Sequence, residues 1–114
     1  MTKAELKEWA PLCEEWDDLC RRIRELESKV AAGRFGMRIE SSLRRLRSQR
    51  NVVNASIEKI EVAVDALPSL ERQLIVLRYC EGRSWQKISQ ELGYSADYLR
   101  GKMHKKALAL LSAM

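Results

Sequence analysis

The side chains best suited to contact an external partner lie near the C-terminus, in a segment rich in serine, lysine and arginine. Residues 68–114 hold eight basic and four acidic side chains. Ser84 and Ser95 each stand directly before a stretch with helical periodicity, as N-cap residues do. Basic side chains and the backbone N–H groups of a helix start bind phosphate, while arginine and lysine also hydrogen-bond base edges. These residues therefore indicate nucleic-acid binding.

Three short helices are predicted to position these side chains. The first would be capped by Ser69, and its core-facing residues would be Leu70, Leu74 and Leu77. The second is predicted over residues 85–92, and Gly93 with Tyr94 would form a tight turn. The third would begin after Ser95, with Leu99, Met103, Ala107 and Leu110 facing the core. Two helices joined by a short glycine-containing turn, the second one basic, are typical of a helix-turn-helix.

The third helix is the one expected to enter the major groove of DNA. Its outward residues would be Ala96, Asp97, Arg100, Gly101 and His104, with Lys102 and Lys105 on the flanks. Arg100 is the first candidate for a base contact, because a guanidinium can bind guanine O6 and N7 together. Asp97 could accept from a cytosine amine or simply favour the positive helix N-terminus. The predicted DNA-binding residues are Arg83, Ser84, Lys87, Ser95, Ala96, Asp97, Arg100, Gly101, Lys102, His104 and Lys105.

The ordered series of residues in this segment resembles region 4 of bacterial sigma-70 factors. The residues that carry the resemblance are Leu67-Pro68, Leu77-Arg78-Tyr79, Gly82, Ile88-Ser89, Leu92-Gly93-Tyr94-Ser95, Lys102-Met103-His104 and Ala107-Leu108. The third helix carries one residue more than the family pattern between Ser95 and Lys102. Nothing in the chain resembles the sigma region that recognises the −10 element. Because that region is missing, a complete sigma factor is not expected. The resemblance implies instead a small phage or prophage transcription regulator.

Residues 1–66 are predicted to form an antiparallel, coiled-coil-like helical hairpin. Apolar residues recur at alternating steps of three and four from Trp9 to Val30 and again from Ile39 to Leu67. Gly33 and Gly36 favour a turn between the two helices, and Pro68 ends the second.

The second helix, about 29 residues long, exceeds the first and would leave part of its apolar seam uncovered. This excess predicts a homodimer through residues 39–67. Arg50 interrupts the seam, and either reaches water through its aliphatic stem or meets an acidic group of a partner helix.

Several classes of protein are disfavoured by the composition. Cys13, Cys20 and Cys80 are odd in number and never spaced as CxxC, so with the single histidine they predict neither disulfides nor a zinc site. No signal peptide or bilayer-length apolar run is seen, which favours the cytoplasm. No glycine-rich phosphate loop or catalytic constellation occurs, so neither an enzyme nor a cofactor is expected.

These features together predict an all-α chain with an oligomerisation or partner-binding hairpin at residues 1–66 and a helix-turn-helix at residues 67–114. The predicted function is sequence-specific binding of double-stranded DNA in transcription regulation. Two alternatives stay open: the DNA-recognition small subunit of a phage packaging terminase, and an accessory protein that binds RNA polymerase. Dimers suit operators, whereas rings suit packaging.

Overall fold

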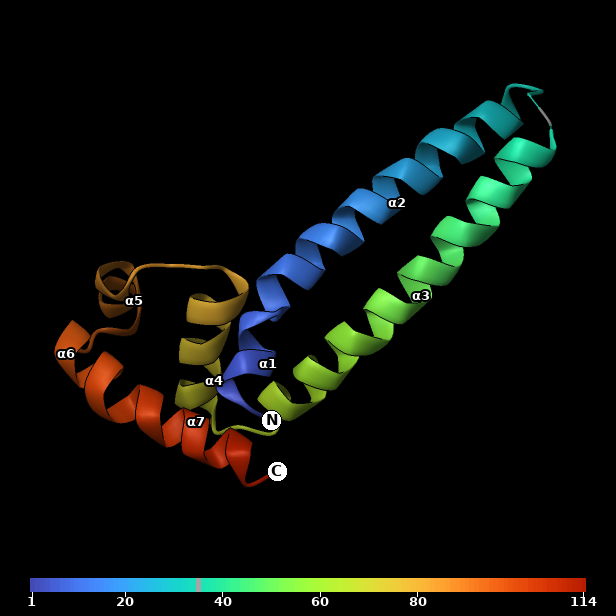
Figure 1. The fold of residues 1–114 in the computed structure, drawn as a ribbon. Coiled ribbons are helices and arrows are strands. Elements are labelled where there is room, and N and C mark those ends of the chain that lie inside the picture. The colour runs from blue at the N-terminus through green and yellow to red at the C-terminus, as the bar shows by residue number, and fades with distance from the viewer. Residues whose placement is uncertain (35) are drawn as a thin grey trace. The chain divides into compact units, whose positions relative to one another are not determined.

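The computed structural model describes residues 1–34 and 36–114, and within these ranges it contains helices and no strand, as predicted. The elements are α1 (Lys3–Lys7), α2 (Trp9–Ala31), α3 (Met37–Asp65), α4 (Ser69–Ile75), η1 (Val76–Cys80), α5 (Trp85–Leu92), α6 (Ala96–Tyr98), η2 (Leu99–Met103) and α7 (His104–Ser112) (Figure 1). Both η elements are single π-helical turns. Among the described helices, none has the length and apolar character needed to cross a membrane.

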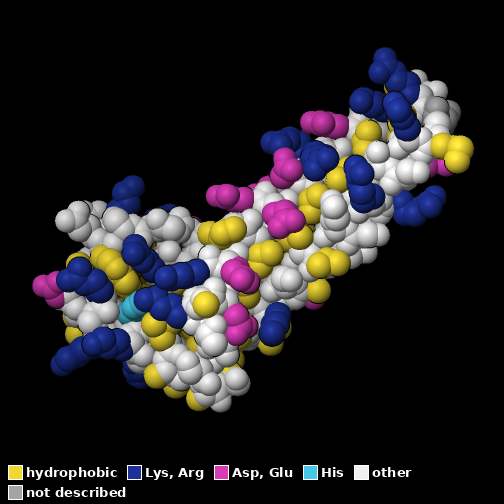
Figure 2. Space-filling model, in the orientation of Figure 1, with side chains coloured by type: hydrophobic (Ala, Val, Ile, Leu, Met, Phe, Trp, Pro, Cys, Tyr) yellow, Lys and Arg dark blue, Asp and Glu magenta, His cyan; other side chains and the backbone are white. Residues whose placement is uncertain are grey.

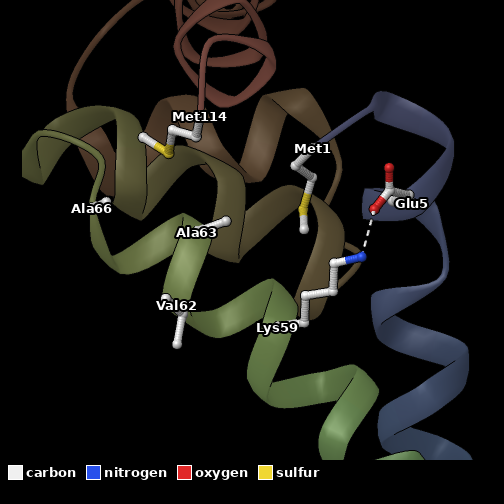
Figure 3. A pocket seen from close by; sticks show the side chains of 7 residues that line it. All are labelled: Met1, Glu5, Lys59, Val62, Ala63, Ala66 and Met114. Atoms are coloured by element: carbon white, nitrogen blue, oxygen red, sulfur yellow. Dashed lines mark ion pairs between the residues drawn. The ribbon is translucent and has the colours of Figure 1, made fainter.

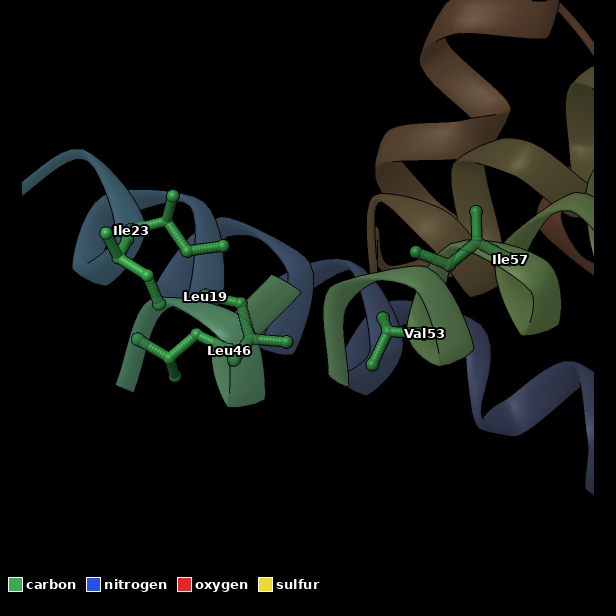
Figure 4. Packing of buried hydrophobic residues seen from close by; sticks show 6 residues of the cluster. Leu19, Ile23, Leu46, Val53 and Ile57 are labelled. Carbon is green, nitrogen blue, oxygen red and sulfur yellow. The ribbon is translucent and has the colours of Figure 1, made fainter. Parts of the chain in front are cut away.

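The chain divides into two compact units, Leu12–Ile57 and Met1–Pro11 with Glu58–Met114. The first unit is the predicted antiparallel hairpin, formed by most of α2 and most of α3 (Figure 1). Its core residues are Leu19, Ile23, Leu43, Leu46, Val53 and Ile57 (Figure 4). Alternating steps of three and four keep these residues on one stripe of each helix, so that the two stripes pack together.

Gly33 ends α2 in the left-handed region, with φ of 85°. Its N–H donates to the Val30 carbonyl at 3.0 Å, and the Arg34 N–H donates to the Lys29 carbonyl at 3.0 Å. A residue with a Cβ would be strained at this φ, which explains the glycine.

Arg50 lies half-buried on the seam of α3, with its guanidinium carbon 5.9 Å from the centroid of the Trp16 ring. Within the chain, its guanidinium therefore faces an aromatic ring of the other helix of the hairpin. Such a cation–π contact contributes about 0.5–1 kcal/mol where it is partly exposed.

The apolar seam of α3 is largely buried within a single chain. Leu43, Leu46, Val53 and Ile57 are buried in the hairpin unit, and Ile60, Val64 and Leu67 are buried in the other unit. The uncovered seam on which the predicted homodimer rested is thus not seen in the described part of α3. The exposed apolar side chains of α3 include instead Val52 and Val62, at 68% and 71% of their full exposure.

The second unit packs α1, the end of α3 and the helices from α4 to α7 around one core. Its buried apolar residues are Leu6, Trp9, Ile60, Val64, Leu67, Leu74, Ile75, Ile88, Leu99, Met103, Ala107 and Leu111. Leu6 is completely buried, and the Met1 amino group donates to the Leu111 carbonyl at 3.0 Å. The first eleven residues and the end of α3 therefore pack with the helix-turn-helix, whereas the predicted boundary at residue 66 had assigned them to the hairpin.

A surface hollow of this unit lies beside α1 and the end of α3 (Figure 3). It is lined by Met1, Glu5, Lys59, Val62, Ala63, Ala66 and Met114. Lys59 Nζ lies 3.8 Å from Glu5 Oε2, which joins α3 to α1. Because both side chains reach solvent, this pair contributes less than about 1 kcal/mol. The burial of Leu6 is the stronger attachment of α1.

Helix α4 begins one residue earlier than predicted. Pro68 occupies the N-cap position with φ of −55° and no side-chain cap, and Ser69 is the first helical residue. The Ser69 hydroxyl accepts from Gln73 Nε2 at 3.3 Å instead of capping the helix. The prediction of a Ser69 cap was therefore wrong, because the fixed φ of proline already sets the chain for a helix start.

A buried carboxylate joins α4 to α7. Glu71 is 6% exposed, and its Oε1 lies 3.1 Å from Lys106 Nζ. Desolvation by burial raises the pKa of Glu71. A backbone hydrogen bond and Lys106 lower it by more, so the pKa lies below the ordinary value of 4.5. The burial of Glu71 could not be predicted from the sequence, because a glutamate one residue after Leu70 does not differ in pattern from a solvated one.

Candidate DNA interface

The turn between α5 and α6 has the geometry predicted for a helix-turn-helix. The Ser84 hydroxyl caps α5 by accepting from the Lys87 N–H at 3.3 Å, and Gly93 ends α5 with φ of 79°. The Ser89 hydroxyl then donates to the Tyr94 carbonyl. The Ser95 hydroxyl caps the next helix by accepting from the Tyr98 N–H at 3.2 Å. Both predicted serine caps are confirmed.

The third helix is continuous from Ala96 to Ser112, but it contains the π turn η2 at Leu99–Met103. In this turn the His104 N–H donates to the carbonyl of Leu99, five residues earlier. A π turn accommodates one residue more than an α-helical turn. This π turn overlaps the stretch between Ser95 and Lys102, where the sequence carries one residue more than the family pattern.

The π turn also corrects the predicted core of this helix. Leu99, Met103 and Ala107 are buried as expected, but the fourth buried residue is Leu111, while Leu110 is half-buried. The prediction assumed an undistorted helix, and the added residue shifts the positions that follow it along the helix surface.

The predicted DNA-binding residues differ in how far they reach solvent. Those exposed are Ser84, Lys87, Ser95, Asp97, Arg100, Lys102 and Lys105. Those half-buried are Arg83, Ala96, Gly101 and His104. The Asp97 side chain is 93% exposed and that of Arg100 63% exposed, and Arg100 Nη2 lies 3.2 Å from Asp97 Oδ1. Figure 2 shows Lys and Arg side chains gathered over the helices α5 to α7.

His104 does not lie on the outward face as predicted. Five residues of an α-helix make about 1.4 turns, which would separate His104 widely from the buried Leu99. The π turn closes within these five residues, so His104 stays near the buried side. Its Nε2 and the Tyr79 hydroxyl share a hydrogen bond of 2.7 Å.

Arg83, which was predicted to contact phosphate, pairs with acidic neighbours in this structure. Its Nη2 lies 3.6 Å from Glu81 Oε1, and its Nη1 pairs with the carboxylate of Glu91 in α5. This geometry joins the loop before α5 to the last turn of α5. Lys87, which is exposed in the first turn of α5, is better placed than Arg83 to bind an anion.

The match to a known family covers the first part of this arrangement. Residues 57–97 match the family Sigma-70, region 4. This segment is similar to region 4 of sigma-70 factors, and it includes the first helix and the turn of the helix-turn-helix. The match begins near the end of α3 and stops at Asp97, at the start of the third helix. Comparison of the chain with curated proteins and with solved structures found no match.

A cluster of three aromatic rings and one arginine joins η1, α5 and α7. The His104 ring stacks on Tyr79 with centroids 5.7 Å apart and meets the edge of Trp85 at 5.1 Å. The Arg78 guanidinium lies 4.8 Å from the Trp85 ring centroid, and Arg78 Nη1 donates to the Arg83 carbonyl at 3.0 Å. Trp85 therefore packs against His104 and Arg78 of the same chain.

The protonation of this cluster follows from its surroundings. Burial lowers the pKa of His104, and the positive charges of Lys3 and Arg78 lower it further, so the imidazole is neutral at pH 7. Burial also raises the pKa of the Tyr79 hydroxyl, against the opposing effect of Arg78. Both groups of the Tyr79–His104 hydrogen bond are thus uncharged, and it acts as a structural contact between η1 and α7.

The region 4 turn also presents an aromatic pair that the sequence analysis did not single out. The rings of Tyr94 and Tyr98 stack with centroids 5.7 Å apart, and both side chains are exposed. The pair flanks Ser95 at the entrance to the third helix. The signal in the sequence was the spacing of four residues between two tyrosines on either side of the Ser95 cap.

Proposed function

We propose that this chain is a sequence-specific, double-stranded DNA-binding transcriptional regulator, with residues 96–112 as its recognition helix. The observation that carries the proposal is an exposed cationic helix that follows a serine-capped turn at the end of a sigma-70 region 4 match. Arg100, Lys102 and Lys105 are all exposed on that helix. Such a helix enters the major groove, while the preceding helix start binds the phosphate backbone.

The start of α5 suits the phosphate contact. Its eight residues begin at the Ser84 cap, and Lys87 adds an exposed positive charge in the first turn. Backbone N–H groups and the positive end of the helix dipole both favour an anion at this place. Phosphate contacts here would fix the orientation of the recognition helix without selecting a sequence.

We further propose that the protein is not an enzyme, needs no cofactor, works in the cytoplasm and is encoded by a phage or prophage. The residues with perturbed pKa values, Glu71, Tyr79 and His104, serve packing contacts between helices. The resemblance to small phage regulators supports the origin.

Replacing Lys102 by alanine should weaken binding to all duplexes alike and lower the salt dependence of binding by about one counterion. The reason is that a lysine–phosphate contact releases counterions but carries no sequence information. Fluorescence anisotropy on labelled duplexes at several salt concentrations measures both effects. Lys29→Ala, a change of equal charge in the hairpin, is the matched control and should leave the slope unchanged. Failure of the folded wild-type chain to bind any duplex at low salt would refute the proposal and favour RNA polymerase as partner.

A homodimer through residues 39–67 would suit a palindromic operator, and we expect sedimentation equilibrium at micromolar concentration to show a dimer. Because the seam itself is buried, the contact would use exposed apolar side chains of α3 outside the seam, of which Val52 lies in the hairpin unit. Val52→Asp should then shift the distribution towards monomer without unfolding the chain. A monomeric wild type would contradict the proposed dimer but not the proposed DNA binding. A ring-shaped oligomer would favour the packaging alternative.

A further inference from the structure

The buried residues of the recognition helix repeat at every fourth position. Leu99, Met103, Ala107 and Leu111 are all at most 5% exposed. In an undistorted α-helix of 3.6 residues per turn, each four-residue step drifts by about 40° around the axis. The π turn over Leu99–Met103 adds a residue to one turn and removes drift from the first of these steps. The buried stripe therefore stays on one side of the helix.

A second stripe follows on the opposite side. Asp97, Gly101 and Lys105 each lie two residues from a buried neighbour, which is about 200° around the helix. The Asp97 side chain is almost fully exposed, and Lys105 is exposed. The backbone of Gly101 is half-buried in the helix, but a Cβ built there would meet nothing within 4 Å. The outward centre of the helix is thus an acid, a bare backbone and a lysine.

Arg100 lies to one side of this stripe. It follows the buried Leu99 directly, and its Nη2 lies 3.2 Å from Asp97 Oδ1 in an exposed ion pair. His104, one residue before Lys105, is held by Tyr79 and Trp85. Lys106, on the other flank, is held by Glu71. Each of these three side chains beside the outward stripe therefore has a partner within the protein.

We propose that Lys105 is the principal base-contacting residue of the recognition helix and that Gly101 allows the helix backbone close to the base edges. The inference rests on the DNA-binding function proposed above. A lysine ammonium can donate to guanine O6 and N7 in the major groove. Glycine at the centre of the outward stripe leaves no side chain between the backbone and the groove. Asp97 and Lys105 lie eight residues apart, about 12 Å along the helix, which spans roughly three to four base-pair steps of 3.4 Å.

The test is selection of bound sequences from a randomised duplex library with the full-length protein, followed by affinity measurements on the selected site. Lys105→Ala should lose the preference for guanine at one position, with a loss of about 10- to 100-fold on the selected site and a much smaller loss on random duplexes. Lys102→Ala, the matched control, removes the same charge from the flank and should enrich the same sequence as the wild type.

Gly101 provides a second, independent readout. Gly101→Ala should raise the melting temperature, because alanine has the higher helix propensity and its Cβ meets open space. The same variant, and Gly101→Gln more strongly, should weaken binding to the selected site. Binding that is unchanged in the stabilised Gly101→Gln protein would overturn the proposed close approach.

The outcomes separate this inference from the function on which it rests. If Lys105→Ala enriches the wild-type sequence and loses affinity uniformly, Lys105 is a phosphate contact, and the inference fails while the DNA-binding function stands. Loss of the base preference in Arg100→Ala rather than in Lys105→Ala would also overturn it. If the folded wild type enriches no sequence, both the inference and sequence-specific binding fail.

Discussion

Replacing Leu6 by alanine is expected to lower the free energy of unfolding of the unit that contains the helix-turn-helix by about 2–5 kcal/mol. Leu6 is completely buried in that unit, although almost eighty residues separate it from Ser84 in the sequence. Truncation would remove apolar contacts and leave a cavity beneath α1. Urea unfolding followed by circular dichroism measures the loss, and DNA affinity should fall once the unit is partly unfolded.

The matched control is Lys7→Ala, which changes an exposed neighbour on the same short helix and should cost less than about 0.5 kcal/mol. A fragment starting at Leu67 should also fold poorly, because it lacks Leu6, Ile60 and Val64 from its core. Normal stability in Leu6→Ala, or a cooperative unfolding transition in the fragment, would show that the N-terminal segment is dispensable to the helix-turn-helix.

Replacing Lys106 by methionine is expected to destabilise the same unit by about 1–3 kcal/mol at pH 7. The variant would leave the Glu71 carboxylate buried without its cation, and Lys106 Nζ now lies 3.1 Å from that carboxylate. The upper range for fully buried pairs, about 3–5 kcal/mol, is not expected, because the Lys106 side chain is 65% exposed and water can partly replace it. Lys105→Met is the matched control for the loss of one charge.

The dependence of this effect on pH identifies Glu71 as its cause. The pKa of Glu71 in the folded protein lies below its ordinary value of 4.5. As the pH falls below 4.5, the unfolded chain takes up the proton first, so the wild type loses the stabilisation from Glu71 as the pH approaches the folded pKa. In Lys106→Met the buried carboxylate is the source of strain, and its protonation relieves that strain. The difference in unfolding free energy should therefore shrink in acid, and a difference that stays constant down to pH 3 would contradict this explanation.

The helices and caps could be predicted because they depend on local chemistry. Steps of three and four residues bring apolar side chains to one stripe, and this rule identified Leu19, Ile23, Leu43 and Leu46 as core residues. Serine before a helix supplies an acceptor for its unpaired N–H groups, which gave the caps at Ser84 and Ser95. The resemblance to sigma-70 region 4 came from the same local series and was confirmed by the family match.

The features that could not be predicted from the sequence depend on contacts between residues distant in the chain or on a helix that departs from ideal geometry. Glu71 is buried only because α7 brings Lys106 beside it. The contact of Arg50 with Trp16 from the other helix of the hairpin was likewise not anticipated. His104 faces inward because η2 closes in five residues and Tyr79 supplies a hydrogen-bond partner. Periodicity counts residues along one regular helix and contains no information on such partners.

The sequence by itself thus determined the all-α class, the hairpin and the helix-turn-helix with its serine caps, because each follows from side-chain chemistry within a few residues. Tertiary structure alone decided that α1 packs with the helix-turn-helix. The reason is that Leu6 is buried in the core of that unit, although it lies far from it in the sequence. It also decided which side chains the recognition helix presents, since the π turn aligns Asp97, Gly101 and Lys105 opposite the core. One added residue changes the direction of every side chain that follows it, and only packing against the other helices fixes where that residue is accommodated.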